Sequence, residues 1–194
     1  MYLIGDIGNT DIKICLFDKN YKVVKKLILK TNLISNKYLS SNLNFLKKYS
    51  PKINIILFSS VVPPVYSIVR KYLKKKLKQK CVELKQINLN KFVKIMVNKK
   101  QVGSDRISNA IGIIDKKSNY IILDFGTATT FDVVIKNKYL GGVIAPGVNL
   151  SLKTLISKAS LIPPVNISKI SKVIGTNTSS AVKSGFYWGY AGLI

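Results

Sequence analysis

One short turn occurs twice in this chain, and each copy lies between two apolar segments that have the composition of strands. The first copy is Asp6-Ile7-Gly8-Asn9-Thr10, and the second is Asp124-Phe125-Gly126-Thr127-Ala128. Apolar residues 2–4 and 12–17 flank the first copy, and a similar pair of segments flanks the second. Matching turns inside matching strand pairs are the expected trace of a duplicated domain. The sequence therefore predicts an α/β protein with two related halves.

Periodic apolar residues predict further strands and helices. The first turn belongs to a three-strand meander over residues 2–29, and the run from 53 to 58 suits a buried strand. Apolar residues at helical spacing, with lysines on the other face, predict a helix over residues 65–80. The other predictions are a helical stretch with Leu39, Leu43 and Leu46, a strand over 91–97, a helix starting at Gly103, a strand over 139–145, and helices over 150–158 and 179–194.

The residue types in the repeated turn point to a phosphate site. A glycine in a tight turn lets backbone N–H groups approach phosphate oxygens, and adjacent Asn or Thr side chains add donors. The carboxylate of Asp6 would repel phosphate unless a cation lay between them, as Mg²⁺ does in phosphoryl-transfer sites. A single copy could be an ordinary hairpin turn. Two copies that face each other across a cleft would hold a nucleotide from both sides, as in the actin, sugar-kinase and Hsp70 group.

A second group of polar residues, Gly103-Ser104-Asp105-Arg106, precedes a predicted helix. It places a carboxylate beside one of only two arginines in the chain. A local salt bridge or a helix N-cap would explain this pair. Alternatively, Asp105 is the base that orients or deprotonates an attacking hydroxyl, and Arg106 holds a substrate carboxylate or phosphate as a bidentate fork.

Composition removes several classes of function. The chain has no histidine, which excludes His-based triads, His general bases and the usual zinc sites. Its net charge of +24 could serve nucleic acid or an anionic membrane. Nearly all of the cations are lysines, however, whereas nucleic-acid surfaces favour arginine forks and interleaved aromatics. We therefore expect solvated lysine faces and no nucleic-acid partner.

The remaining features concern location and length. Cys15 and Cys81 form neither a metal-ligand spacing nor a disulfide framework, and no apolar run is long enough for a membrane span or signal peptide. We therefore expect a cytoplasmic protein without a membrane partner. The apolar run over residues 185–194 has no helix stop signal, so we expect the C-terminal part to be truncated.

Taken in order, the motifs resemble those of type III pantothenate kinases over nearly the whole chain. They are Asp6 to Thr10, Ser60-Val61-Val62-Pro63, Gly103 to Arg106, Asp124 to Thr129, Gly141 to Gly147 and Gly175 to Gly185. The resemblance implies duplicated actin-like (ribonuclease H-like, ASKHA) domains over residues 1–115 and 116–194, with mixed sheets flanked by helices. It also implies a homodimer with the pantothenate pocket at its interface. The reaction would be ATP-dependent phosphorylation of the primary hydroxyl of pantothenate, which gives 4'-phosphopantothenate and begins coenzyme A synthesis.

The same resemblance implies roles for individual residues. Asp105 resembles the proton acceptor, and Asp124 the ligand of a monovalent cation, K⁺ or NH₄⁺, that acts beside Mg²⁺ bound with ATP. Gly103, Ser104, Asp105, Arg106 and Thr178 would bind pantothenate. The ATP contacts would be Asp6, Ile7, Gly8, Asn9, Thr10, Asp11, Ile12, Lys13 and Thr127.

Two departures from the family pattern leave alternatives open. Residues 97–101 replace a Tyr and a Pro that line the substrate pocket in many relatives, and the chain ends before a Thr-Gly-Gly loop that packs around adenosine. One alternative is an actin-like regulator that binds a ligand without turnover. The other is a basic nucleic-acid-binding protein with the same fold.

Overall fold

The computed structural model describes all 194 residues, Met1–Ile194, and its first sheet is mixed. Three consecutive antiparallel strands form the predicted meander, and two later strands add to it in parallel. The strand order is β3-β2-β1-β4-β5. The strands are β1 (Tyr2–Ile7), β2 (Asp11–Phe17), β3 (Val23–Lys30), β4 (Ile55–Ser60) and β5 (Cys81–Glu83).

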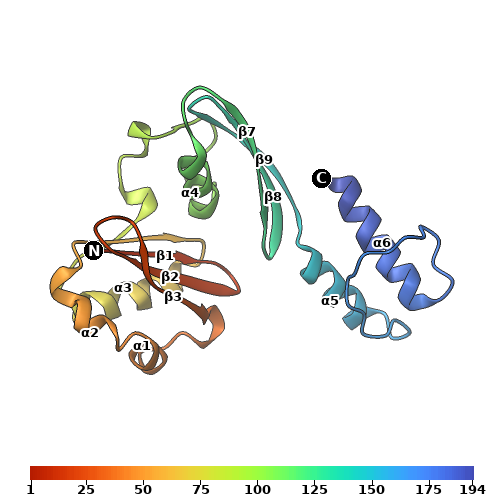
Figure 1. Cartoon of the computed structure of the whole chain (residues 1–194), viewed down its shortest axis with the longest axis horizontal. Helices are drawn as coiled ribbons and strands as arrows, with labels where there is room; N and C mark the ends of the chain where they lie inside the picture. Colours follow the sequence, from red (N-terminus) through yellow and green to blue (C-terminus); the bar gives the residue numbers. More distant parts are fainter. The chain divides into compact units, whose positions relative to one another are not determined.

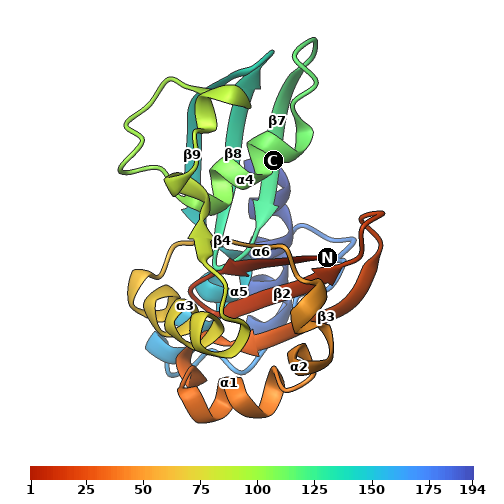
Figure 2. The same ribbon diagram turned by 90° about the vertical axis from the view of Figure 1, so that its left-hand side faces the viewer.

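Helices on one side of this sheet cover its apolar face, as Figure 2 shows for α1, α2 and α3. Alternation along β1 and β2 buries Leu3, Ile12 and Ile14, which join Val69 and Leu73 of α3 in one core. Pro63 begins α3, where its fixed φ suits the first helical turn. The helices are α1 (Asn36–Asn42), α2 (Leu46–Tyr49) and α3 (Pro63–Leu77).

The strand expected over residues 91–97 is largely wrong. The structure has a 3-10 helix at Leu89–Lys91, followed by a strand of only two residues, β6 (Lys94–Ile95). The side chain of Asn88 accepts from the backbone N–H of Asn90, which favours the 3-10 turn that ends at Lys91. Within residues 91–97, only Val93 and Ile95 are buried.

The second sheet has the order β6-β9-β8-β7, and β6 lies parallel to β9. Two-residue turns join β7 to β8 and β8 to β9, so these strands are hairpins (Figure 1). The predicted helices also form, and Gly103 is the N-cap of α4. The elements are β7 (Asn119–Phe125), β8 (Ala128–Ile135), β9 (Lys138–Pro146), α4 (Ser104–Ile113), α5 (Val148–Lys158) and α6 (Thr178–Leu193).

By internal contacts the chain divides into two compact units. The first holds Met1–Ile122 and Asp132–Gly141, and the second holds Leu123–Phe131 and Gly142–Ile194. The boundary at 115/116 separates two predicted repeats of the sequence, whereas the two units are defined by contacts, so that boundary stays a prediction. None of the helices has the length and apolar character that crossing a bilayer requires.

Candidate active site

Hydrogen bonds to Thr31 hold the first Asp-Gly turn in shape. The N–H of Gly8 donates to the carbonyl of Asp11 at 3.0 Å, and the N–H of Thr31 donates to the carbonyl of Thr10 at 3.0 Å. The Thr31 hydroxyl donates to the carbonyl of Gly8 at 2.8 Å. Asn9 and Thr10 are exposed at the tip. The turn therefore presents polar groups on an ordered backbone.

The other residues predicted to contact ATP divide by exposure. Ile7 and Ile12 are fully buried in the core, so only their backbone groups could meet a nucleotide. Lys13 is exposed on β2. Asp11 forms an ion pair with Lys30 at 2.7 Å.

Asp6 is oriented by a residue that the sequence motifs did not include. Asp6 and Ser59 are register partners on the parallel strands β1 and β4. The Ser59 hydroxyl donates to Asp6 Oδ1 at 2.6 Å, and Ser59 is buried. Only the strand pairing brings these two residues together, so no local sequence signal could have found Ser59.

The start of α4 lies near the same end of the first sheet. The N–H of Val61, directly after β4, donates to the carbonyl of Ile7 at 3.0 Å. A β-carbon on Gly103 would lie 3.4 Å from Val61 Cγ1 and would clash with Asp105 Oδ1. Glycine at position 103 therefore leaves room for the Asp105 carboxylate, which accepts from the N–H of Arg106 at 2.8 Å. The first turn follows β1, and the start of α4, which carries Asp105, lies beside the residue that follows β4; both are at the carboxyl ends of parallel strands, where α/β sheets commonly bind ligands.

Ser104 is buried, and its hydroxyl donates to Glu83 Oε1. The other oxygen of Glu83 accepts from the N–H of Lys85 at 2.7 Å. Glu83 therefore ties the start of α4 to the segment after β5. A contact between Ser104 and a substrate would have to use its backbone.

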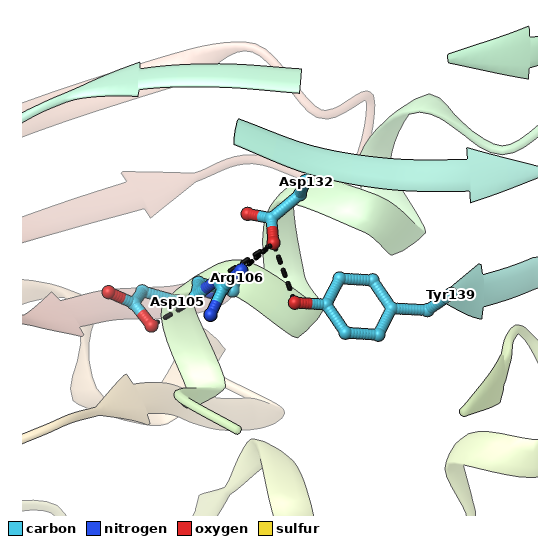
Figure 3. A network of polar contacts seen from close by, with 4 residues as sticks. All are labelled: Asp105, Arg106, Asp132 and Tyr139. Carbon is cyan, nitrogen blue, oxygen red and sulfur yellow. Dashed lines mark hydrogen bonds and ion pairs between the residues drawn. The ribbon is translucent and has the colours of Figure 1, made fainter. Parts of the chain in front are cut away.

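Arg106 pairs with a distant residue, Asp132 on β8 (Figure 3). Its Nε donates to Asp132 Oδ1 at 2.7 Å, and its Nη2 lies 2.6 Å from the same oxygen. The hydroxyl of Tyr139, on β9, also donates to Oδ1 at 2.6 Å. Burial disfavours the charge of Arg106, but the hydrogen bond and the charge of Asp132 outweigh it and raise its pKa. The sequence motifs missed Glu83, Asp132 and Tyr139, because nothing local marks them.

The second Asp-Gly turn is exposed at Asp124 and Thr127. The N–H of Gly126 donates to the carbonyl of Ala128 at 2.9 Å, and the N–H of Gly147 donates to the carbonyl of Thr127 at 3.0 Å. A β-carbon on Gly147 would clash with the carbonyl of Gly126. The Gly141 to Gly147 loop therefore ends in a glycine that lets it pack directly against the second turn.

Thr178 is exposed in the first turn of α6, between the two members of a capping box, Asn177 and Ser180. Thr178, Asp124 and Thr127 belong to the second unit, whereas the first turn and the Gly103 to Arg106 group belong to the first unit. The predicted residues are thus divided between the two units.

Two cavities have linings that include none of the predicted site residues. One, of about 420 Å³, lies between α5 and α6 and is mostly apolar, with Leu155 and Phe186 in its lining. The other, of about 440 Å³, is lined by Lys85, Lys99 and Lys100 with two asparagines. No three His, Cys, Asp or Glu side chains gather into a group that could hold a metal ion.

Comparison with known proteins adds to this geometry. A family model described as type III pantothenate kinase matches residues 2–194. A type III pantothenate kinase of Pelagibacter ubique is 57% identical over 194 residues, covering 100% of this chain and 78% of that protein. Another, from Syntrophus aciditrophicus, is 35% identical and covers 100% of this chain and 79% of that protein.

Two solved structures share the fold. A Campylobacter jejuni protein, described as a Baf family transcriptional activator, aligns with a TM-score of 0.59 at 20% identity, covering 98% of this chain and 76% of that one. A Sinorhizobium meliloti protein, described as a 2-dehydro-3-deoxygalactonokinase, aligns with a TM-score of 0.57 at 8% identity, covering 98% and 80%. At these identities the two structures show the α/β fold alone.

Proposed function

The chain belongs to the type III pantothenate kinase family, and from this premise we propose which of its residues carry out the reaction. It is a kinase that uses ATP to phosphorylate the primary hydroxyl of pantothenate, the first step of coenzyme A synthesis. The family match over residues 2–194 is the observation that carries this function. It also favours the kinase over a non-catalytic regulator or a nucleic-acid-binding protein.

Asp105 acts as the proton acceptor for the attacking hydroxyl. Its carboxylate is held at the first turn of α4 by the N–H of Arg106, beside a glycine that leaves it space. Phosphoryl transfer depends mainly on positioning and electrostatic stabilisation, so a fixed carboxylate near the phosphate turn suits the reaction. Gly103, Ser104, Asp105, Arg106 and Thr178 contact pantothenate, and among them Arg106 holds its carboxylate.

The first turn and the three residues after it, Asp6 to Lys13 in all, bind the phosphates of ATP, and Thr127 adds a further contact. The exposed tip and ordered backbone of the turn support this role. Mg²⁺ in nucleotide sites is usually held by one or two carboxylates together with phosphate oxygens, which fits the carboxylate of Asp6. Asp124 supplies an exposed carboxylate for K⁺ or NH₄⁺. Such cations offset charge that develops on the transferred phosphoryl group.

Further expectations follow from the family. Both sheets contain three consecutive hairpin-linked strands, β1 to β3 and β7 to β9, which supports a duplicated actin-like fold. We also propose a homodimer with the pantothenate site at its interface, and a cytoplasmic location.

The test is ADP release by the purified protein with pantothenate, Mg²⁺ and K⁺. We expect pantothenate-dependent turnover that the Asp105→Asn variant loses by roughly 100-fold or more in kcat, as for removal of a general base. Replacing K⁺ by Na⁺ should lower the rate. Absence of pantothenate-dependent ADP release from the unaltered protein would contradict the function.

A further inference from the structure

Asp132 and Tyr139 have no role in the reaction as described so far, yet both contact Arg106 or its partner oxygen (Figure 3). All three residues belong to the first unit. We propose that Asp132 and Tyr139 are positioning residues that hold the guanidinium of Arg106 in the orientation that binds the carboxylate of pantothenate. The proposal rests on the proposed substrate contact of Arg106.

The burial of the pair distinguishes it from an ordinary surface ion pair. Asp132 is 0% exposed and Tyr139 is 1% exposed, whereas the side chain of Arg106 keeps 14% of its surface accessible. A buried carboxylate is costly unless charged and hydrogen-bonding partners compensate for it. Here the guanidinium of Arg106 is the charged partner of Asp132, and the hydroxyl of Tyr139 adds a hydrogen bond. The bonded edge of the guanidinium is thus fixed in the interior, and part of the side chain stays accessible.

The hydrogen bonding of this cluster is incomplete. All the donors converge on Asp132 Oδ1, whereas Oδ2 is buried with no hydrogen-bond partner. Nη2 of Arg106 lies close to Oδ1 but is buried without an aligned acceptor. Buried polar groups are nearly always satisfied, so such gaps need a reason. A guanidinium has five N–H donors in a planar fork, so a second carboxylate that approaches through the accessible part of the Arg106 side chain could pair with donors that Asp132 leaves.

The charges of the cluster suit this role. The hydrogen bond and the charge of Asp132 raise the pKa of Arg106, so the guanidinium stays cationic in spite of its burial. Burial and the neighbouring Asp132 raise the pKa of Tyr139, so its hydroxyl stays a donor to the carboxylate. Arg106 would therefore meet a second carboxylate as a fixed cation.

A purely structural role is the competing explanation, because the same bonds tie α4 to the β8–β9 hairpin. The two roles differ in substrate selectivity. Pantothenyl alcohol has the same reacting hydroxyl as pantothenate but an alcohol in place of the carboxylate. If the cluster orients Arg106 toward that carboxylate, weakening the cluster should affect pantothenate far more than the alcohol.

The experiment measures kcat and KM for both compounds with Asp132→Asn and Tyr139→Phe, and pantothenate binding by calorimetry. For pantothenate we expect KM and the dissociation constant to rise roughly 10- to 100-fold in Asp132→Asn and about 5-fold in Tyr139→Phe. The KM for the alcohol should change less than about 3-fold. Tyr66→Phe is a matched control, since it removes another buried hydroxyl, which donates to the carbonyl of Cys81 at 3.2 Å.

Two results would overturn the proposal. In one, KM rises equally for both compounds and in step with the loss of melting temperature, which is the behaviour expected of the Tyr66→Phe control. In the other, the affinity for pantothenate does not change in a folded variant. If Asp132→Asn does not fold, Tyr139→Phe decides by the same criteria. If the unaltered protein binds pantothenate without turnover, the kinase assignment fails, and calorimetry still tests the positioning role.

Discussion

The two Asp-Gly turns share a sequence pattern, but the strands that precede them differ in their pairing and burial. β1, before the first turn, pairs with β2 on one side and β4 on the other. β7, before the second turn, is the last strand in its sheet. Leu3 on β1 is 0% exposed, whereas Ile121, at the matching position on β7, is 67% exposed. A repeated motif therefore predicts a strand-turn-strand unit twice, but the two turns differ in length and hydrogen bonding, and the neighbouring strands determine what each turn can do.

The largest expected effect comes from truncating these two matching side chains. Leu3→Ala should lower the free energy of unfolding by about 2–5 kcal/mol, since it leaves a cavity in the core. Ile121→Ala should change it by less than about 0.5 kcal/mol, because the side chain is mostly in solvent. Urea denaturation measures both. Equal losses would mean that β7 is covered in solution, and the contrast between the strands would be lost.

A smaller effect is expected at the glycines. Gly5 packs against the ring of Phe58 on β4, and a β-carbon there would clash with the ring. Gly5→Ala should therefore destabilise the protein by about 1–3 kcal/mol through overpacking. At Gly126 the nearest atom, the Ala128 carbonyl oxygen, would be 3.6 Å away, so Gly126→Ala should be nearly neutral. Thermal melts of the two variants would decide; a neutral Gly5→Ala would show that Phe58 can move aside.

The third prediction concerns the orientation of Asp6. Ser59→Ala removes the hydroxyl that donates to Asp6 Oδ1. A hydrogen bond to a charged group is worth about 1.5–3 kcal/mol, so we expect KM for Mg-ATP to rise roughly 10-fold with little change for pantothenate. Ser118→Ala is the control, because it removes a similar hydroxyl–carboxylate bond, to Asp115 at 2.7 Å. If both variants keep the original KM, Ser59 does not position Asp6.

The smallest effect should follow from breaking the Lys30–Asp11 ion pair beside the first turn. Both side chains are partly in solvent, so Lys30→Ala should cost at most about 1 kcal/mol of stability. Raising the salt concentration should reduce the difference between variant and original protein. A loss that is large and independent of salt would indicate that this pair holds the turn in shape.

The parts of the molecule that sequence could predict are those with local causes. Apolar periodicity predicted α3 and β4, and the spacing of Gly103, Asp105 and Arg106 predicted the start of α4. The strand predicted over residues 91–97 was largely wrong, because a turn capped by the Asn88 side chain takes in Lys91 and only Lys94 and Ile95 pair with β9.

The missed residues have non-local causes. Ser59 meets Asp6 through strand register, and Asp132 meets Arg106 across 26 residues of chain. A single sequence shows periodicity and local spacing, but it does not show which strands pair. The candidate site could therefore be predicted at its turns, and its supporting residues could be found only in the folded chain.

If the first turn binds the phosphates of ATP, as proposed, the bonds from Thr31 bear on the thermodynamics of that binding. The N–H and hydroxyl of Thr31 hold the carbonyls of Thr10 and Gly8, on either side of the exposed tip. A loop that is already ordered loses little conformational entropy when a ligand arrives. We therefore expect ATP to bind a turn that already has its bound conformation. Substitutions at Thr31 should weaken binding through a larger loss of conformational entropy, with the enthalpy of the phosphate contacts nearly unchanged.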